Sequence, residues 1–251
     1  MAGSGVWRRS IIAVWSILSK DVHTYYLKPP NISWGIIFPI AWTLMFFLRA
    51  EQAMDVQSIL PGVMSLSILF GTTSMLAVTV TFEKRSRSFE RLLLAPISLN
   101  LLMLAKTSGA ILFGIGNASV PLILALLWDR TLVLEWLPLM LGVVLLAVTS
   151  TFLGFFIAVS VREVFEAQTF SNFFRFPMLF LCGLFIPIAQ LPLFLQPLSY
   201  ALPLTYGVDI LRQAVTGDGI LSYYFSFPIL TAFALGLFFL SVRNVNRKWI
   251  L

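Results

Sequence analysis

The chain has 251 residues, of which 59% are hydrophobic and 11% are charged, and its formal net charge is +6. A soluble domain carries roughly a quarter charged residues, so this composition excludes an ordinary soluble fold and favours a bilayer protein. The single cysteine, Cys182, excludes a disulfide framework within the chain. The single histidine, His23, has no carboxylate cluster near it in sequence, so we predict no metal site.

The amino-terminal segment predicts a helix that lies flat at the membrane surface. From Val6 to Tyr25, apolar residues recur every three or four positions, and the Arg8–Arg9 pair and Lys20 fall between them. A basic amphipathic helix with tryptophans is typical of the membrane interface. A signal peptide would need a longer uninterrupted apolar core and a small-residue cleavage site. We therefore assign residues 1–28 to an interfacial helix.

Long uncharged runs predict six membrane-spanning helices, because about 20 apolar residues cross the hydrocarbon core. Five of these runs suit one helix each and lie at residues 32–48, 55–83, 106–129, 135–162 and 218–243. The remaining run, from Arg175 to Asp209, is too long for one helix and contains five prolines. It predicts a span that ends near Pro187, and then a re-entrant element of short broken helices over 188–208. Broken backbone at membrane depth needs protein or water around it, so this element is expected to line a path.

The distribution of basic residues predicts the orientation. An even number of spans puts both termini on one side, and 14 of the 17 basic residues then fall on that side, with Arg49, Arg130 and Arg212 on the other. Lys and Arg concentrate in cytoplasmic segments, so we expect both termini in the cytoplasm. The 14 residues expected inside are Arg8, Arg9, Lys20, Lys28, Lys84, Arg85, Arg87, Arg91, Lys106, Arg162, Arg175, Arg243, Arg247 and Lys248.

Two mixed-charge loops on the expected inner side have the composition of a docking surface. The first, 83–96, follows the second span and ends in an apolar triplet and a proline, and the second, 162–166, repeats this composition over a shorter stretch. A solvated loop explains the basic residues but not the carboxylates or the apolar side chains. Apolar anchors supply affinity for a partner and charges fix its register. We therefore predict a short docking helix in the region 83–98.

This first loop resembles that of a known family, the ABC-2 type transporter permeases. In that family an acidic residue and a basic cluster follow the second span and lead into a coupling helix and a Leu-Leu-x-x-Pro element. This chain has Glu83 and then Glu90-Arg91-Leu92-Leu93-Leu94-Ala95-Pro96. It departs from the family pattern at Ser86 and Ser88, where glycine is frequent in the family, and these differences bear on coupling.

A second patch late in the chain is similar to the closing signature of the same family. It comprises Gly183 to Pro187, Pro203 to Tyr206 and Asp209 to Arg212. Leu202 stands where the family often has asparagine. With the span count and the amphipathic start, the resemblance covers nearly the whole chain.

The resemblance implies an all-α integral membrane protein with one ABC-2 type transmembrane domain over 1–251. It implies the permease subunit of an exporter in the inner membrane, which moves an amphiphilic drug, lipid or lipid-linked glycan outward. The expected partners are a second permease copy and separate ABC ATPase subunits that bind ATP and magnesium, with no cofactor on this chain and no nucleic acid. The coupling residues expected to meet the ATPase are Glu83, Lys84, Arg85, Arg87, Phe89, Glu90, Arg91, Leu92, Arg162, Glu163, Phe165 and Glu166. The residues expected to gate the outer end are Pro187, Pro192, Tyr200, Pro203 and Tyr206.

Missing motifs separate this interpretation from its rivals. No G-x-x-x-x-G-K-[ST] sequence is present, so we expect no ATP hydrolysis on this chain, and we assign no catalytic residue. No carboxylate, lysine or histidine falls at the centre of an expected span, which disfavours an ion-coupled carrier. An ATP-independent channel or ion-coupled carrier is the alternative, and gradient-driven transport without ATP would reveal it. Small residues at 114–119 predict close helix packing, and the hydroxyls of the second span serve either packing or a polar route.

Overall fold

A computed structural model describes residues 3–26, 37, 40–41, 43–45, 56–94, 98–130, 132–184 and 186–247, with the backbone alone for 3–11, 90 and 93. Its elements are helical, and the described residues contain no strand. The elements are α1 (Gly3–Asp21), η1 (Val22–Tyr26), α4 (Val56–Arg85), α5 (Ser88–Leu93), α6 (Leu99–Trp128), α7 (Trp136–Ser160), α8 (Val164–Leu181), η3 (Ile188–Gln190), α9 (Gln196–Tyr200), α10 (Pro203–Thr216) and α11 (Tyr223–Val245).

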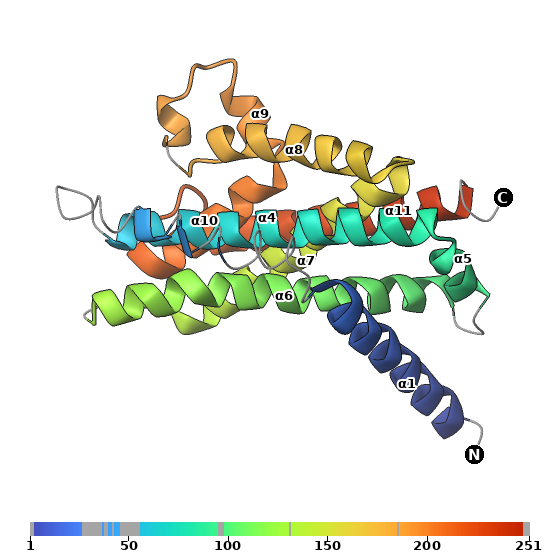
Figure 1. Cartoon of the computed structure of the whole chain (residues 1–251). Coiled ribbons are helices and arrows are strands. Elements are labelled where there is room, and N and C mark those ends of the chain that lie inside the picture. The colour runs from blue at the N-terminus through green and yellow to red at the C-terminus, as the bar shows by residue number, and fades with distance from the viewer. Residues whose placement is uncertain are drawn as a thin grey trace.

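Four helices are long and apolar enough to cross a membrane: α4, α6, α7 and α11. They have 30, 30, 25 and 23 residues, and at 1.5 Å per residue even the shortest is about 35 Å long, which exceeds a hydrocarbon core of about 30 Å. They match four of the six expected spans, and in Figure 1 they run side by side along the bundle. The expected first span, 32–48, lies outside the described residues except for a few isolated positions.

The expected fifth span is placed differently by the structure. We predicted that a helix follows Arg175 and ends near Pro187, with Arg175 itself in an inner segment. Instead α8 begins at Val164, directly after α7, and ends at Leu181, so Arg175 lies inside it. The side chain of Arg175 is buried against α4. The expected start of the fifth span is therefore wrong, because Arg175 lies within a helix rather than before it.

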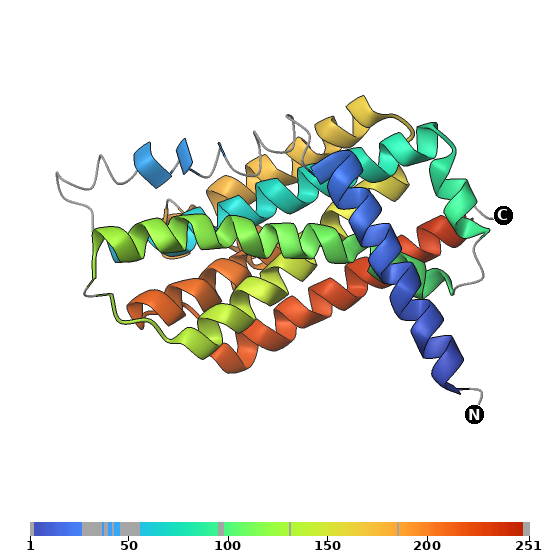
Figure 2. The same ribbon diagram turned by 60° about the horizontal axis from the view of Figure 1, so that its bottom comes forward.

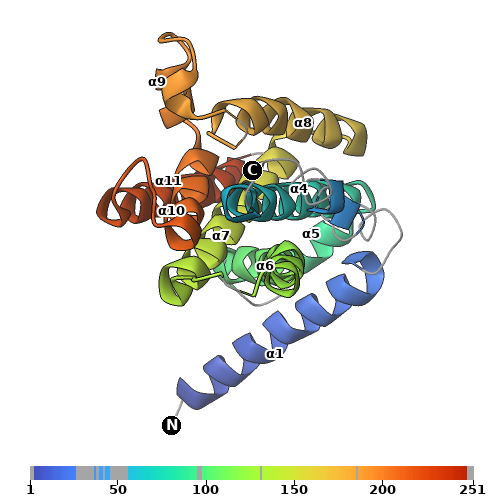
Figure 3. The ribbon, with the colours of Figure 1, turned by 90° about the vertical axis from the view of Figure 1, so that its left-hand side faces the viewer.

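The predicted amphipathic helix is present as α1 and the π-helical turn η1. Figures 2 and 3 show α1 crossing the outside of the bundle at a steep angle, in contact with α6. Its Trp15 is exposed, while Ile17 is buried against Leu102 and Ala105 of α6. The helix α1 therefore packs on the bundle through Ile17 and leaves Trp15 uncovered, and its flat position at the membrane surface stays a prediction.

The centre of the bundle is α4, which packs against α6, α7, α8 and α10 (Figure 3). Two glycines bring neighbouring helices close to it. A Cβ on Gly154 of α7 would lie 2.8 Å from the Cα of Thr73, and a Cβ on Gly114 of α6 would overlap the Thr72 side chain. Small residues at helix crossings allow such close approach, so the packing role predicted for the 114–119 segment is confirmed at Gly114.

Five hydroxyl groups of α4 bond to their own helix rather than to an open route, while those of Ser74 and Thr79 are buried without a hydrogen-bond partner in the described structure. Each of the five donates to the carbonyl oxygen four residues earlier, which satisfies a buried hydroxyl within one helix. They belong to Ser65, Ser67, Thr72, Thr73 and Thr81. In this conformation the hydroxyls therefore stabilise the interior of the bundle.

Short helices fill the segment between α8 and α11, as its prolines predict. η3 and α9 lie beyond the end of α8 (Figure 1), and α10 then returns to pack on α7 and α4. α10 continues to Thr216, which is past the expected end of the re-entrant element at residue 208. The re-entrant position of this segment in the membrane stays a prediction.

Candidate coupling site

The first mixed-charge loop begins at a turn that serine hydroxyls hold in place. Ser86 and Ser88 both donate to the carbonyl oxygen of Glu83, at 3.1 and 3.2 Å. Between them Arg87 has a φ of 56°, the one positive φ of a non-glycine residue in the described part of the chain. A left-handed backbone costs a residue with a Cβ about 1–2 kcal/mol. The serine hydroxyls thus stabilise a turn that glycine would adopt more easily.

The short helix α5 docks on its own bundle through Phe89. This ring is completely buried, in a cluster that contains Met103 of α6 and Phe155 of α7. Arg91 and Leu94 point the other way, and Leu94 is 86% exposed. Phe89 was expected among the residues that meet a partner, but its burial makes it the anchor that fixes α5. A partner on this surface would meet Arg91 and Leu94.

Glu83, at the end of α4, lies in a buried network of four charged side chains. Its carboxylate oxygens lie 2.5 Å from the Nζ of Lys20 and 2.5 Å from the Nζ of Lys106. Lys106 Nζ also donates to both carboxylate oxygens of Asp21, at 2.8 and 2.7 Å. Glu83, Lys106 and Asp21 are buried, and Lys20 reaches them from the surface. Two positive and two negative groups make the network neutral.

This network joins α1, α4 and α6 at one place. Removing one member of a buried ion pair typically costs about 3–5 kcal/mol, because the partner charge stays buried. Burial raises the pKa of the Asp21 carboxyl, and the Lys106 ammonium opposes that rise. The charge of Asp21 therefore depends on Lys106, and the attachment of the surface helix α1 depends on both.

The second mixed-charge loop starts α8 with a reciprocal hydrogen-bonded cap. Glu166 Oε2 accepts from the backbone N–H groups of Arg162 and Glu163, at 2.9 and 3.4 Å, and the Glu163 side chain accepts from the first turn in return. These two N–H groups lower the pKa of the Glu166 carboxyl. Phe165 is 85% exposed beside the cap. The cap thus fixes an aromatic side chain in an exposed position.

The two loops are neighbours at the same end of the bundle. The Nζ of Lys84, in the last turn of α4, lies 3.4 Å from the carbonyl oxygen of Val161, the residue that ends α7. In Figure 1 this end also carries α5, the start of α1 and the end of α11. The expected coupling residues differ here in their burial. Glu83 and Phe89 are buried, Lys84 and Leu92 are half-buried, only the backbone of Glu90 is described, and the exposed members are Arg85, Arg87, Arg91, Arg162, Glu163, Phe165 and Glu166.

The expected outer-gate residues lie in the segment of short helices between α8 and α11, and they also divide by burial. Pro187 and Pro192 are exposed, Tyr200 is partly exposed, and Pro203 and Tyr206 are buried at the start of α10. The Tyr206 hydroxyl donates to the carbonyl oxygen of Tyr200 at 2.7 Å, which ties α10 to α9. The buried members thus hold the short helices together, and the exposed members form their free edge.

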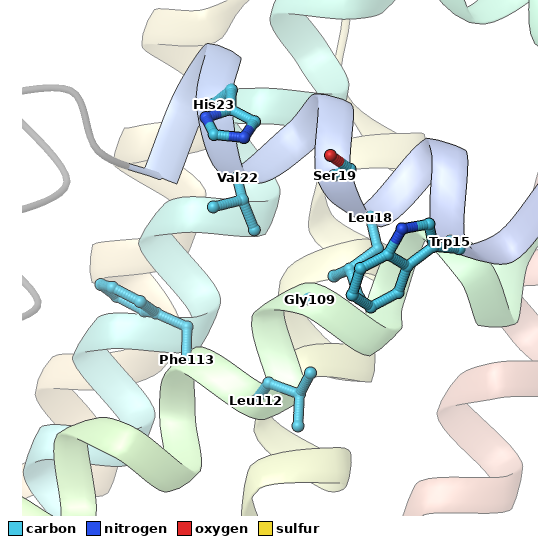
Figure 4. A pocket seen from close by; sticks show the side chains of 8 residues that line it. All are labelled: Trp15, Leu18, Ser19, Val22, His23, Gly109, Leu112 and Phe113. Carbon is cyan, nitrogen blue, oxygen red and sulfur yellow. The ribbon is translucent and has the colours of Figure 1, made fainter.

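An apolar groove separates the end of α1 from α6. It encloses about 470 Å³, and Figure 4 shows Trp15, Leu18 and Val22 of the amino-terminal segment opposite Leu112 and Phe113. The groove lies beside the ion network, since Asp21 precedes Val22 directly. α1 is therefore held at its end by charges and leaves part of its apolar face uncovered.

Sequence reasoning missed three charged residues that the structure joins to Glu83 in one network. Lys20 and Lys106 were counted only as basic residues of the inner side, and Asp21 was not assigned a role. Lys106 lies eight positions into α6 among apolar residues. A lysine in such a place needs a carboxylate partner, and that requirement was the available signal. Nothing local indicated which carboxylates would supply it.

Comparisons with known proteins agree with the resemblance. A family model described as ABC-2 type transporter matches residues 12–216. The chain is 23% identical over 244 residues to the inner membrane transport permease YadH of Escherichia coli strain K12, with 94% of this chain and 95% of that protein covered. It is also 37% identical over 82 residues to nodulation protein J of Sinorhizobium fredii, which covers 32% of this chain and 30% of that protein. Nodulation protein J of Rhizobium meliloti is 27% identical over 118 residues, or 45% of each chain.

Proposed function

The chain belongs to the ABC-2 type transporter family, and we propose that it is the permease of an ATP-driven exporter. The family is one of transport permeases, and the chain is similar over 94% of its length to an inner membrane permease. Its four long apolar helices agree with a multi-pass protein of that membrane. In our proposal separate ABC ATPase subunits bind ATP and magnesium, and two copies of this chain form the transport unit.

The observation that carries this proposal is the exposed surface formed by the two mixed-charge loops. Arg91 and Leu94 from the first loop and Phe165 from the second are exposed at the same end of the bundle. An exposed aromatic side chain with arginines around it is the composition of binding hot spots. We propose that the ATPase docks here, which makes this end cytoplasmic and puts both termini in the cytoplasm.

Each loop continues directly into a helix of the bundle. The first follows α4, which is the central helix, and the second begins α8, which packs against α4. A push on the two loops would therefore shift α4 and α8 against each other. The buried network behind Glu83 would pass the same movement to α1 and α6, since Lys20 and Lys106 belong to those helices.

At the other end we propose that the segment of short helices gates the exit. Its hydrogen bonds, such as that from the Tyr206 hydroxyl to the Tyr200 carbonyl oxygen, keep α9 and α10 together. Its edge around Pro192 is exposed. We propose an amphiphilic drug, lipid or lipid-linked glycan as the substrate and outward movement as the direction, in line with the family resemblance.

The ATPase interface can be tested with Phe165→Ala. The side chain is 85% exposed, so its loss leaves the fold intact, while loss of a hot-spot aromatic weakens binding roughly tenfold or more. Copurification of the ATPase subunits from membranes, and ATP-dependent transport in proteoliposomes, would both fall. Tyr224→Ala is the matched control, because Tyr224 is a similarly exposed aromatic at the far end of the bundle. Equal ATPase recovery with both variants would exclude this interface.

An ion-coupled carrier has one observation in its favour, the buried carboxylates of Asp21 and Glu83. Each of them is already neutralised by a lysine, which leaves no charge for a transported cation to balance. Transport in proteoliposomes separates the two functions. We expect it to require ATP and to continue with a protonophore present, whereas a carrier would run on the gradient alone.

A further inference from the structure

Arg175 is a buried arginine with no counter-ion among the described residues. It lies between α8 and α4 with 1% of its surface exposed. Its Nε donates to Thr73 Oγ1 at 2.6 Å and its Nη1 to Asn172 Oδ1 at 3.3 Å. The guanidinium also lies over the Phe70 ring, 5.1 Å from its centre. Its Nη2 is buried without a hydrogen-bond partner in the described structure.

The position of this arginine along the bundle makes the lone charge unusual. Thr73 lies 12 residues before the end of α4 at Arg85, which corresponds to about 18 Å along the helix. That distance reaches the middle of a hydrocarbon core about 30 Å thick. The Phe70 ring under the guanidinium belongs to an apolar cluster with Leu66 and Leu179. Arg175 is thus a cation at mid-depth with neutral neighbours.

A structural role alone accounts poorly for an arginine at this position. Buried charges are normally paired, because desolvation of an unpaired ion costs several kcal/mol. A glutamine at position 175 could hydrogen-bond to Thr73 and link α8 to α4 without the cost of burying a charge. Charged residues retained at membrane depth mark the path of a substrate or ion. The buried, unpartnered Nη2 is the donor that an anion in that role would meet.

Resting on the proposed function, we propose that Arg175 binds the headgroup of the substrate, and that this substrate is an amphiphile with an acidic headgroup. Phosphate and carboxylate match the planar guanidinium, which can donate two parallel hydrogen bonds to either. The apolar part of the substrate would lie along the exposed face of α8. That face carries the phenylalanines Phe173, Phe176 and Phe180.

The seam that covers Arg175 is formed by the two helices that lead from the docking loops. α4 ends at the first loop and α8 starts at the second. A shift of α8 away from α4 separates the guanidinium from Thr73 and exposes it to a headgroup. The binding site is therefore closed in this structure, and a shift of α8 away from α4 opens it, whether thermal motion or the ATPase drives that shift.

Headgroup-dependent binding tests this inference. The full chain with its ATPase is placed in phosphatidylcholine nanodiscs, and a fluorescent lysophosphatidic acid serves as the bound probe. Competitors with one acyl chain length but different headgroups are lysophosphatidic acid, lysophosphatidylcholine and monoacylglycerol, and inorganic phosphate is a fourth competitor. We expect lysophosphatidic acid to compete at a concentration roughly tenfold lower than monoacylglycerol.

Three variants separate the charge from the structural contact. Arg175→Gln keeps a hydrogen-bond donor for Thr73 but should abolish the roughly tenfold preference for the acidic lipid. Arg175→Lys should keep most of the preference, because it keeps the positive charge. Arg212→Gln is the control, since Arg212 bonds to the carbonyl oxygen of Gly183, a neutral acceptor. The preference should survive in that variant.

Each outcome decides one claim. Equal competition by acidic and neutral lipids on the unmodified chain would overturn the inference, even if the Gln variant failed to fold. Competition by inorganic phosphate as effective as that by lysophosphatidic acid would replace the amphiphile by a free anion and also overturn it. The binding readout needs no ATP. Charge-dependent binding by a chain that recovers no ATPase would support Arg175 while removing the proposed exporter.

Discussion

The two ends of the bundle each bury a carboxylate, and they stabilise it in different ways. The docking end is the end of the bundle that carries the two mixed-charge loops, and there Glu83 forms ion pairs with Lys20 and Lys106, which come from two other helices. At the far end Asp209 of α10 accepts from the backbone N–H of Ile220 at 2.6 Å and from the Ser226 hydroxyl at 2.7 Å. The partners of Asp209 thus lie within 17 residues of it, while Lys20 is 63 residues from Glu83.

This difference separates a rigid turn from a network that can follow movements of the helices. Backbone donors on a short connection cannot move far from Asp209, so its bonds fix the turn from α10 to α11. Long lysine side chains can follow Glu83 through a small shift, and they link three helices that have no short connection between them. The docking end therefore has the means to transmit movement, whereas the turn from α10 to α11 has the means to resist it.

The largest effect is expected from Lys106→Met. It leaves Asp21 and Glu83 buried with Lys20 alone, which should cost about 3–5 kcal/mol of stability. The measurement is the midpoint of thermal unfolding of the detergent-solubilised chain by size-exclusion chromatography. Adding Asp21→Leu to Lys106→Met should recover part of the loss, because it removes a charge left without its partner. No recovery in the double variant would contradict the pairing of these two residues.

Asp209→Asn should have a smaller effect at the other end. It removes charge-assisted hydrogen bonds worth about 1.5–3 kcal/mol and turns an amide donor toward backbone donors. The same unfolding assay measures it, with Asp218→Asn as control because Asp218 is exposed in the same loop. A greater loss from Asp209→Asn than from Lys106→Met would reverse the comparison between the ends.

Arg87→Gly should stabilise the docking end by about 1 kcal/mol. The far end already has glycine at its positive φ positions, Gly183 and Gly217, whereas the docking end has Arg87 at a φ of 56°. Arg85→Gly is the control, since Arg85 lies in the helical region of α4, where glycine destabilises. A lower unfolding temperature for Arg87→Gly would show that the Arg87 side chain contributes more than its backbone costs.

The smallest effect is expected from Glu166→Gln at the cap of α8. The folded state lowers the pKa of Glu166 below its ordinary value of 4.5. Its contribution is therefore fully present above pH 4.5 and is lost as the pH falls through the folded-state value. Glu166→Gln should lower the unfolding temperature slightly at pH 7 and reduce its dependence on acid. An unchanged acid dependence would mean that the cap contributes nothing to stability.

The spans and the surface helix could be predicted because their signals are local. The charged residues that mark the two ends of α4, α6, α7 and α11 are separated by about one helix length. The apolar residues of α1 recur every three or four positions. The error at Arg175 came from the same rule. A charge was taken as the end of a run, although a carboxylate at residue 163 and another three positions later mark the start of a helix.

The ion network could not be predicted from the sequence, because its members are far apart in it. Asp21 and Lys106 are separated by 85 positions. The docking loops themselves were visible from their composition, but the burial of Phe89 was not. The short helix α5 carries one aromatic side chain, Phe89. Its inward orientation depends on how α6 and α7 pack beneath α5, which the local sequence does not reveal.

The contact between Gly154 and Thr73 determines which helices can travel separately. A Cβ at residue 154 would lie 2.8 Å from one backbone atom of Thr73 and 3.0 Å from another, so α7 and α4 touch through their main chains. Sliding one along the other would bring their backbone atoms into steric clash. We therefore expect α4 and α7 to move as one rigid unit, and α8, which follows α7 after a three-residue connection, to be the helix that moves relative to them.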